Sequence, residues 1–413
     1  MAATINTNIA SINAQRNLTL SGQSLNTTMQ RLSSGLRVNS AKDDAAGLAI
    51  AERMNTQVKG MTVASRNAND GISLAQTTEG ALGKIGDMLQ RMRELAVQAG
   101  NATNSASDRA ALQAEVKQMS DEIDRVAKQT NFNGQKVLDG SFAGAVFQVG
   151  ANSGDNITLG ALVDTRSSQL SSISYAGTDI ASVDTSIGAA ALSGFASGVS
   201  GLKITVAPPG QTIDLNDLPA AESRQERLGQ VIEAINNKTA DSGVTAYLTK
   251  NEGTETYKVE LRSEKLDKDG IPVSISFGGF SASTTGLDNT ATAIGGSNTT
   301  TVGAVYNDSG IDTIDVRTQA GAWTALKKID SAIDQVNGAR ATLGAIQTRF
   351  ETAVNNIDVQ VENLSAARGR IVDTDFAKET ANLSRTQILQ QAGTAMVAQA
   401  NQIPQNVLKL LQG

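Results

Sequence analysis

Proline occurs at only five positions, and its placement limits the possible folds more than any other feature of this chain. The prolines are Pro208, Pro209, Pro219, Pro272 and Pro404, so residues 1–207 and 273–403 contain none. A proline inside a helix costs about 3 kcal/mol, because it removes a hydrogen bond and clashes with the preceding turn. The two proline-free stretches therefore permit very long helices, and the spacing of apolar residues decides where these form.

Residues 50–99 carry an apolar repeat of seven residues. The first set of apolar residues is Met54, Met61, Ala68, Ala75, Leu82, Leu89 and Ala96. The second set lies three or four residues from the first and is Ile50, Val58, Ile72, Ile85, Met92 and Ala99. This pattern, held for about seven heptads, is typical of a coiled coil. Residues 77–80 interrupt it with weak helix formers, and we expect a soft point there.

Two further long helices are predicted from the same kind of spacing. One covers about 106–129, with Ser107 or Asp108 as the residue that caps its start. The other runs through about 323–368. Three helices within one chain can cover one another, so we expect residues 50–129 and 323–368 to pack intramolecularly.

The middle of the chain, about 180–300, is rich in Gly, Ser, Thr and Asn and loses the heptads. Alternating apolar residues predict strands near 202–206, 244–249, 256–263 and 273–277. Ser223 and Glu226 form a capping box that opens a helix through about Asn236. The expected fold is mainly α: a long coiled-coil helical rod formed by both chain ends, with a small α+β insertion domain in the middle.

Both ends of the chain carry apolar residues at helical spacing. The candidate contact residues are Ile5, Ile9, Ile12, Leu25, Leu32, Leu389, Met396, Ile403 and Leu410, of which the last four recur every seven residues. An isolated helix in water is marginal, so each terminal helix needs a partner. The spacing leaves open whether that partner is the other terminus, another subunit or both.

The composition excludes several classes of function. The chain has no Cys and no His, which rules out disulfides, thiolate metal sites, Ser-His-Asp triads and HExxH zinc sites. Its net charge of −6 argues against a dedicated nucleic-acid binder. No run approaches the ~18 apolar residues of a membrane span, and the N-terminus lacks the pattern of a cleaved secretory signal. We expect no enzyme, no cofactor and no catalytic or metal-binding residues.

Several long motifs resemble those of bacterial flagellin. They are LSSGLRVNSAKDDAAGLAI at 32–50, ANDGISLAQTTEGAL at 68–82, LQRMRELAVQ at 89–98, FNGQKVL at 132–138, and the run from ARGRIVDTDF at 367–376 to Leu411. The resemblance covers about 1–175 and 320–413 in the same order. Several independent long motifs are a far more specific signal than one short motif.

The resemblance implies a subunit that polymerises into the flagellar filament, with terminal helices that order on assembly. It implies an inner core domain of residues 1–43 and 370–413, a helical domain of 44–180 and 301–369, and a variable outward-facing insertion of 181–300. It also implies secretion to the extracellular filament by the flagellar type III export apparatus with an export chaperone. Hook-associated and cap proteins would be partners, besides other copies of the chain.

A receptor surface is a second implication of the resemblance. Gln90, Arg91, Leu95 and Glu115 match positions that immunostimulatory flagellins present to Toll-like receptor 5, although assembly contacts alone could account for them. The nearest rival function is that of a hook-filament junction adaptor, which shares the terminal helices.

Overall fold

The computed structural model describes residues 7–186, 192–207, 210–251, 254–268, 271–287 and 304–412, but not the side chains of 181–182, 304–305 and 403–412. The chain divides into two compact units. The first comprises Met1–Ile72, Val146–Ile157 and Thr348–Gly413, and the second comprises Ser73–Ala145 and Thr158–Gln347. None of the described helices is both long and apolar enough to cross a membrane.

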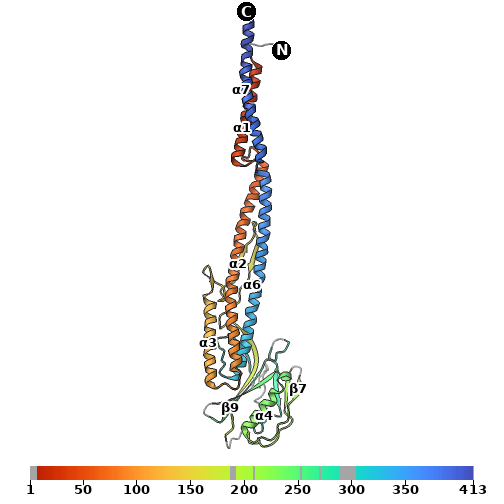
Figure 1. Cartoon of the computed structure of the whole chain (residues 1–413). Helices are drawn as coiled ribbons and strands as arrows, with labels where there is room; N and C mark the ends of the chain where they lie inside the picture. The colour runs from red at the N-terminus through yellow and green to blue at the C-terminus, as the bar shows by residue number, and fades with distance from the viewer. Residues whose placement is uncertain are drawn as a thin grey trace. The chain divides into compact units, whose positions relative to one another are not determined.

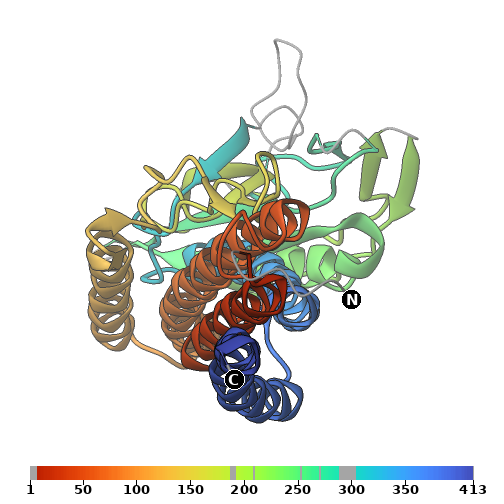
Figure 2. The same ribbon diagram turned by 90° about the horizontal axis from the view of Figure 1, so that it is seen from above.

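The first unit contains the paired chain ends. It holds α1 (Ile9–Ser34), α7 (Phe376–Gln412), the start of α2 (Ala45–Ala99) and the end of α6 (Gln319–Val372). The helices α1 and α7 lie side by side in both views of the molecule (Figure 1, Figure 2). The hairpin of β3 (Ala145–Gln148) and β4 (Asn156–Leu159) packs here through Phe147, whose ring meets that of Phe350 edge-on at 5.3 Å.

The predicted long helices are confirmed as α2 and α6, which each contribute residues to both units. The helix α2 runs unbroken through residues 77–80, where weak helix formers interrupt the apolar repeat and a soft point is expected. The Thr78 side chain is fully buried and donates to the Leu74 carbonyl at 2.8 Å, which satisfies its hydroxyl within the helix. The heptad residues from Ala68 to Ala96 are buried except for Ile72, which is half-buried, whereas Ile50 is 44% exposed.

The helix α3 (Ala106–Gln129) has the predicted bounds but a different cap. Ser105 is the N-cap: its Oγ accepts from the Asp108 N–H at 3.2 Å, and the Asp108 carboxylate accepts from the Ser105 N–H at 3.0 Å. Asp108 is therefore one half of a capping box, and the assignment of the cap to Ser107 or Asp108 is wrong. After α3 come the two short strands β1 (Asn131–Phe132) and β2 (Gln135–Lys136).

The second unit also contains the α+β insertion, which is built on two antiparallel sheets. One has the order β11-β5-β9-β8, with β5 at Ser172–Asp184, β8 at Val244–Lys250, β9 at Thr256–Ser263 and β11 at Ala304–Ser309. The other has the order β10-β6-β7, with β6 at Lys203–Ala207, β7 at Gln211–Asp214 and β10 at Ser274–Gly278. The four strands predicted in the middle are confirmed as β6, β8, β9 and β10.

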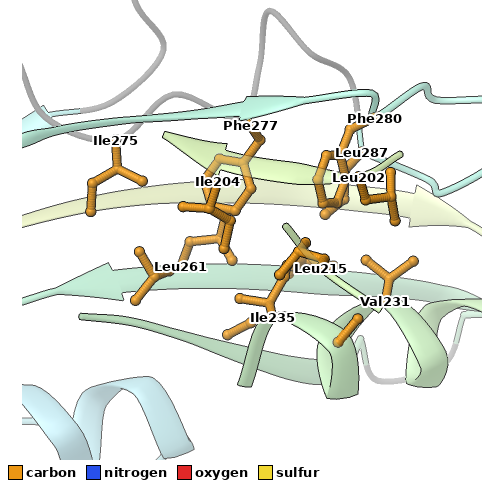
Figure 3. Close-up of a cluster of buried hydrophobic side chains, with 14 of the residues drawn as sticks. Leu202, Ile204, Leu215, Val231, Ile235, Leu261, Ile275, Phe277, Phe280 and Leu287 are labelled. Carbon is orange, nitrogen blue, oxygen red and sulfur yellow. The ribbon is translucent and has the colours of Figure 1, made fainter. Parts of the chain in front are cut away.

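The core of this insertion lies between the sheets and α4 (Arg224–Asn236), beside the short α5 (Thr239–Ser242). Figure 3 shows Ile204, Phe277 and Leu261 of the sheets facing Val231 and Ile235 of α4. The Ser223 Oγ accepts from the Glu226 N–H at 3.1 Å, which confirms the predicted start of this helix. The Glu226 carboxylate accepts from the Glu222 N–H at 2.7 Å and not from that of Ser223, so the predicted capping box is only half formed. The insertion therefore has an apolar core of its own.

Candidate functional site

The turns that follow α1 and α6 hold the chain ends together. Gly35 ends α1 in the left-handed conformation, at φ +69°, which a residue with a Cβ adopts only with strain. The Arg37 N–H donates to the Val372 carbonyl at 2.6 Å, and its guanidinium donates to the Ile371 carbonyl at 2.6 Å. The Thr374 N–H donates to the Gly35 carbonyl at 3.0 Å. These bonds fix the point from which α1 and α7 run side by side.

The seam between α1 and α7 consists mostly of small and polar side chains. On α7, the residues that face α1 recur every seven positions: Glu379, Thr386 and Ala400 are buried, and Gly393 lies between them. A Cβ added at Gly393 would lie 3.1 Å from the Leu18 Cδ1 of α1, so the absence of a side chain lets the helices approach closely. On the α1 side, Ser11 and Thr28 are buried in the same seam.

Polar contacts join the two helices at both ends of the seam. The Asn8 side chain accepts from the Ser11 N–H at 3.1 Å as the N-cap of α1 and donates to the Ala400 carbonyl of α7 at 2.8 Å. The Ser11 hydroxyl donates to Asn401 at 2.7 Å. Toward the other end, Arg31 and Glu379 form an ion pair at 3.7 Å. The pair is therefore aligned by specific bonds but buries little large apolar surface.

Several large apolar residues of this helix pair lie on its outside. Ile9 is 64% exposed, Ile12 56%, Leu20 54% and Met396 65%. We call Ile9, Ile12 and Leu20 the α1 ridge. An open groove of about 220 Å³, the α1/α7 groove, is lined by Ala14, Asn17, Leu18 and Ser21 of α1 and by Leu389, Ala392, Gly393 and Met396 of α7. Clusters of large exposed apolar side chains typically mark sites of protein association.

The structure places the predicted terminal residues in three different settings. Ile9, Ile12, Leu389 and Met396 are exposed, whereas Leu25 and Leu32 are half-buried against α7. Ile5 and the side chains of Ile403 and Leu410 lie outside the described residues. The heptad that contains Leu389 and Met396 does not form the seam with α1. Each of its residues follows a seam residue, Thr386 or Gly393, by three positions. Sequence reasoning missed the seam of Glu379, Thr386, Gly393 and Ala400, whose only signal is a seven-residue spacing of small and polar residues.

A second candidate surface lies on α2 and α3 in the second unit. The Arg91 guanidinium donates to Glu115 at 3.1 Å and to Glu94 at 2.8 Å, and these hydrogen bonds, that of Glu94 first, raise the pKa of Arg91. Gln90 and Arg91 are exposed, and Glu115 is partly exposed. Leu95 is only 1% exposed and belongs to the helical core, so it does not share this surface.

The fold and these surfaces define a class: a mainly helical structural subunit whose paired terminal helices carry exposed apolar side chains. Residues 5–143 match the bacterial flagellin N-terminal helical region, and residues 326–411 match the C-terminal helical region. The chain belongs to the bacterial flagellins, and it is a subunit of the flagellar filament.

Full-length relatives agree with this assignment. A flagellin of Salmonella choleraesuis is 40% identical and a B-type flagellin of Pseudomonas aeruginosa is 37% identical, each alignment covering the whole of both chains. A solved structure of FliC from Burkholderia pseudomallei is 26% identical, with a TM-score of 0.38, and covers 68% of this chain and 99% of that one.

Proposed function

We propose that the α1–α7 pair is the surface through which subunits polymerise, and that its helices gain most of their order as neighbours cover them. The observation that carries this proposal is the burial pattern of the pair: its buried positions hold small and polar residues, whereas several large apolar residues, among them Ile12 and Met396, are more than half exposed. Fixing a residue's backbone costs about 1–2 kcal/mol, and burial returns roughly 25 cal/mol per Å² of apolar surface. A pair that leaves Ile9 and Met396 exposed recovers little of that cost alone.

Seeded growth of the full chain tests this proposal. Purified monomer is added to sheared filament fragments, and elongation is followed by light scattering and electron microscopy. Met396→Ser and Ile12→Ser are expected to slow elongation strongly, whereas Gln391→Ser, at an exposed polar position of α7, grows as the parent chain. Normal growth of the first two variants would contradict the proposal.

Hydrogen exchange tests the ordering step separately. Amides of residues 9–34 and 376–400 are expected to exchange quickly in the monomer and slowly in the filament, while those of α3 are protected in both. Equal protection of the terminal helices in monomer and filament would show that they are ordered before assembly.

The five-segment domain division and the remaining partners follow from the same proposal. Residues 1–43 and 370–413 form the inner core, 44–180 and 301–369 the helical domain, and 181–300 the outward insertion. Apolar stripes that stay uncovered before assembly need protection, so we expect an export chaperone to bind the chain ahead of the flagellar export apparatus. Hook-associated and cap proteins would then contact the extracellular filament at its two ends. The role is structural and not catalytic.

The rival function, a hook-filament junction adaptor, makes a different prediction for the same growth assay. A filament subunit adds to seeds without limit, because identical head-to-tail contacts do not close. An adaptor stops after a short cap or ring. Long filaments grown from this chain alone would therefore exclude the adaptor.

A second function, recognition of the free monomer by Toll-like receptor 5, is favoured by the Arg91 surface. Arg presents several directed donors and is a frequent interface anchor. We assign the contact to Gln90, Arg91 and Glu115, since Leu95 is buried. Arg91→Ala monomer is expected to lose reporter-cell activation while still assembling. Arg93→Ala is the matched control, because Arg93 also lies on α2 and is ion-paired, at 2.7 Å to Asp330. Unchanged activation by Arg91→Ala would refute the assignment.

A further inference from the structure

The four-stranded sheet of the second unit carries a band of charged residues on the face that points away from the insertion core. Val259 of β9 belongs to that core, and side chains alternate along a strand, so Lys258, Glu260 and Arg262 lie on the opposite face. Lys258 and Arg262 are ion-paired to Glu260, at 2.8 and 3.3 Å, and to Asp179 of β5, at 3.3 and 2.5 Å. We call these four residues the β9 network. Its two cations balance its two anions.

An open cavity of about 300 Å³, the β9 cavity, lies against this network. Its wall includes Glu260 and Arg262 of β9, Tyr175 of β5, Asp308 of β11 and Lys328 of α6. Lys328 is only 1% exposed and is ion-paired to Asp308 at 2.8 Å, so this side of the cavity is also balanced in charge. One water molecule occupies about 30 Å³ in the liquid, and ligand pockets begin at about 300 Å³. The cavity is therefore large enough for one small molecule and not for a long chain.

Two buried polar atoms of the β9 network have no hydrogen-bond partner among the described residues, namely Glu260 Oε2 and Arg262 Nε. The Glu260 side chain is 4% exposed, and its other oxygen, Oε1, accepts from Lys258 and Arg262. The Arg262 side chain is 9% exposed, and its two terminal nitrogens donate to Asp179 and Glu260. Buried polar atoms in native proteins nearly always have a partner. The two residues that line the cavity therefore offer it one acceptor and one donor.

We propose that the β9 cavity binds one small neutral molecule with adjacent hydroxyl groups, such as a single sugar ring. A charged ligand would disturb a cluster whose charges already balance, and an unbalanced buried charge is costly. A hydroxyl group both donates and accepts. One hydroxyl of the ligand donates to Glu260 Oε2, and the next accepts from the Arg262 Nε–H. This site is independent of the proposed polymerisation surface, because its residues belong to the second unit and α1 and α7 to the first.

Saturation-transfer NMR of the full chain tests the proposal, with D-glucose, D-galactose and glycerol as neutral probes and glycine and phosphate as charged ones. The parent chain is expected to transfer saturation to at least one neutral probe. Arg262→Lys keeps the positive charge beside Asp179 but removes the Nε–H, so it should weaken that binding tenfold or more. Arg317→Lys is the matched control, because Arg317 is 64% exposed and does not line this cavity. Binding of the charged probes alone, equal binding by all three chains, or no binding, which leaves only water in the cavity, would overturn the proposal.

The fluorescence of Trp323 provides a second readout that needs no variant. Trp323 is the only tryptophan of the chain, and its ring meets the ring of Tyr175, a residue of the cavity wall, edge-on at 5.8 Å. Binding of a neutral probe should shift the Trp323 emission along a saturable curve. Exclusion of sugars from the protein surface also changes stability, but it grows with sugar concentration without saturating. A response of the parent chain that never saturates would therefore refute binding, even if Arg262→Lys fails to fold.

Discussion

The contact between Phe350 and Gly71 offers a sharp test of how α2 and α6 pack in the first unit. The Phe350 ring is fully buried, and a Cβ built on Gly71 would lie only 2.7 Å from its Cζ. The same ring meets Phe147 of the β3–β4 hairpin. Gly71 is therefore required to be a glycine because the ring lies directly against the backbone of α2.

The expected magnitudes follow from this geometry. Removing the ring in Phe350→Ala creates a cavity and should cost about 3–5 kcal/mol. In Gly71→Ala, overpacking should cost about 1–3 kcal/mol, offset by about 1 kcal/mol of improved helix propensity. In the double variant, the new methyl group enters the space that the ring has left. The cost of the double variant should then be about 1–2 kcal/mol smaller than the sum of the two single-variant costs, a difference within the range typical of residues in contact.

Local hydrogen exchange is the suitable assay, because a chain of two compact units need not unfold in a single step. The free energy of opening is compared at residues 60–75 and 345–355 in the parent, both single variants and the double variant. Gly80→Ala is the matched control: it lies on the same helix with nothing within 4 Å of its Cβ position, so it should stabilise α2 by about 0.5–1 kcal/mol. Additivity within about 0.5 kcal/mol, or stabilisation by Gly71→Ala, would refute the packing argument.

Three further predictions concern the second unit. Ser105→Ala should destabilise α3 by about 0.5–2 kcal/mol in thermal unfolding, because it removes the N-cap that pairs with Asp108. Burial raises the pKa of Tyr247 to about 12, so its phenolate absorbance should appear at a higher pH than that of a free tyrosine. The stability that the protonated Tyr247 contributes should decline as the pH rises above about 10. Burial acts to raise the pKa of Asp179, but the hydrogen bond and charge of Arg262 outweigh it and lower the pKa below the usual value. The sheet should therefore lose stability as the pH falls below about 4, and Asp179→Asn should flatten that dependence in Trp323 fluorescence.

The insertion shows where reasoning from sequence succeeds and where it stops. The strands β8 and β9 were predictable because their residues alternate between an apolar face and a polar face. The helix α4 was predictable from Ser223 and Glu226. The strand β7 was not, since four residues with one buried side chain carry almost no periodic signal, and its place is set by pairing with β6. Pairing between strands is a property of the folded chain.

The cap of α3 shows a similar limit at a single residue. Ser105, Ser107 and Asp108 are all good cap residues, so propensity alone does not rank them. The choice falls on Ser105 because only that start places Asp108 at the position that returns a hydrogen bond to the cap.

The amino-acid sequence by itself determined the long helices, the small insertion and the membership of the flagellins, because spacing and motifs are properties of a linear string. It also determined that each terminal helix needs a partner, but it left open whether that partner is the other terminus, another subunit or both. Only the tertiary structure decided which side of each helix faces its partner. The helices approach along Gly393 and Ala400, because close backbone contact requires small side chains, and this choice leaves Leu389 and Met396 uncovered. A count of apolar residues predicts that the stripe of Leu389 and Met396 faces α1, whereas close packing of the two helices selects the stripe of Gly393 and Ala400.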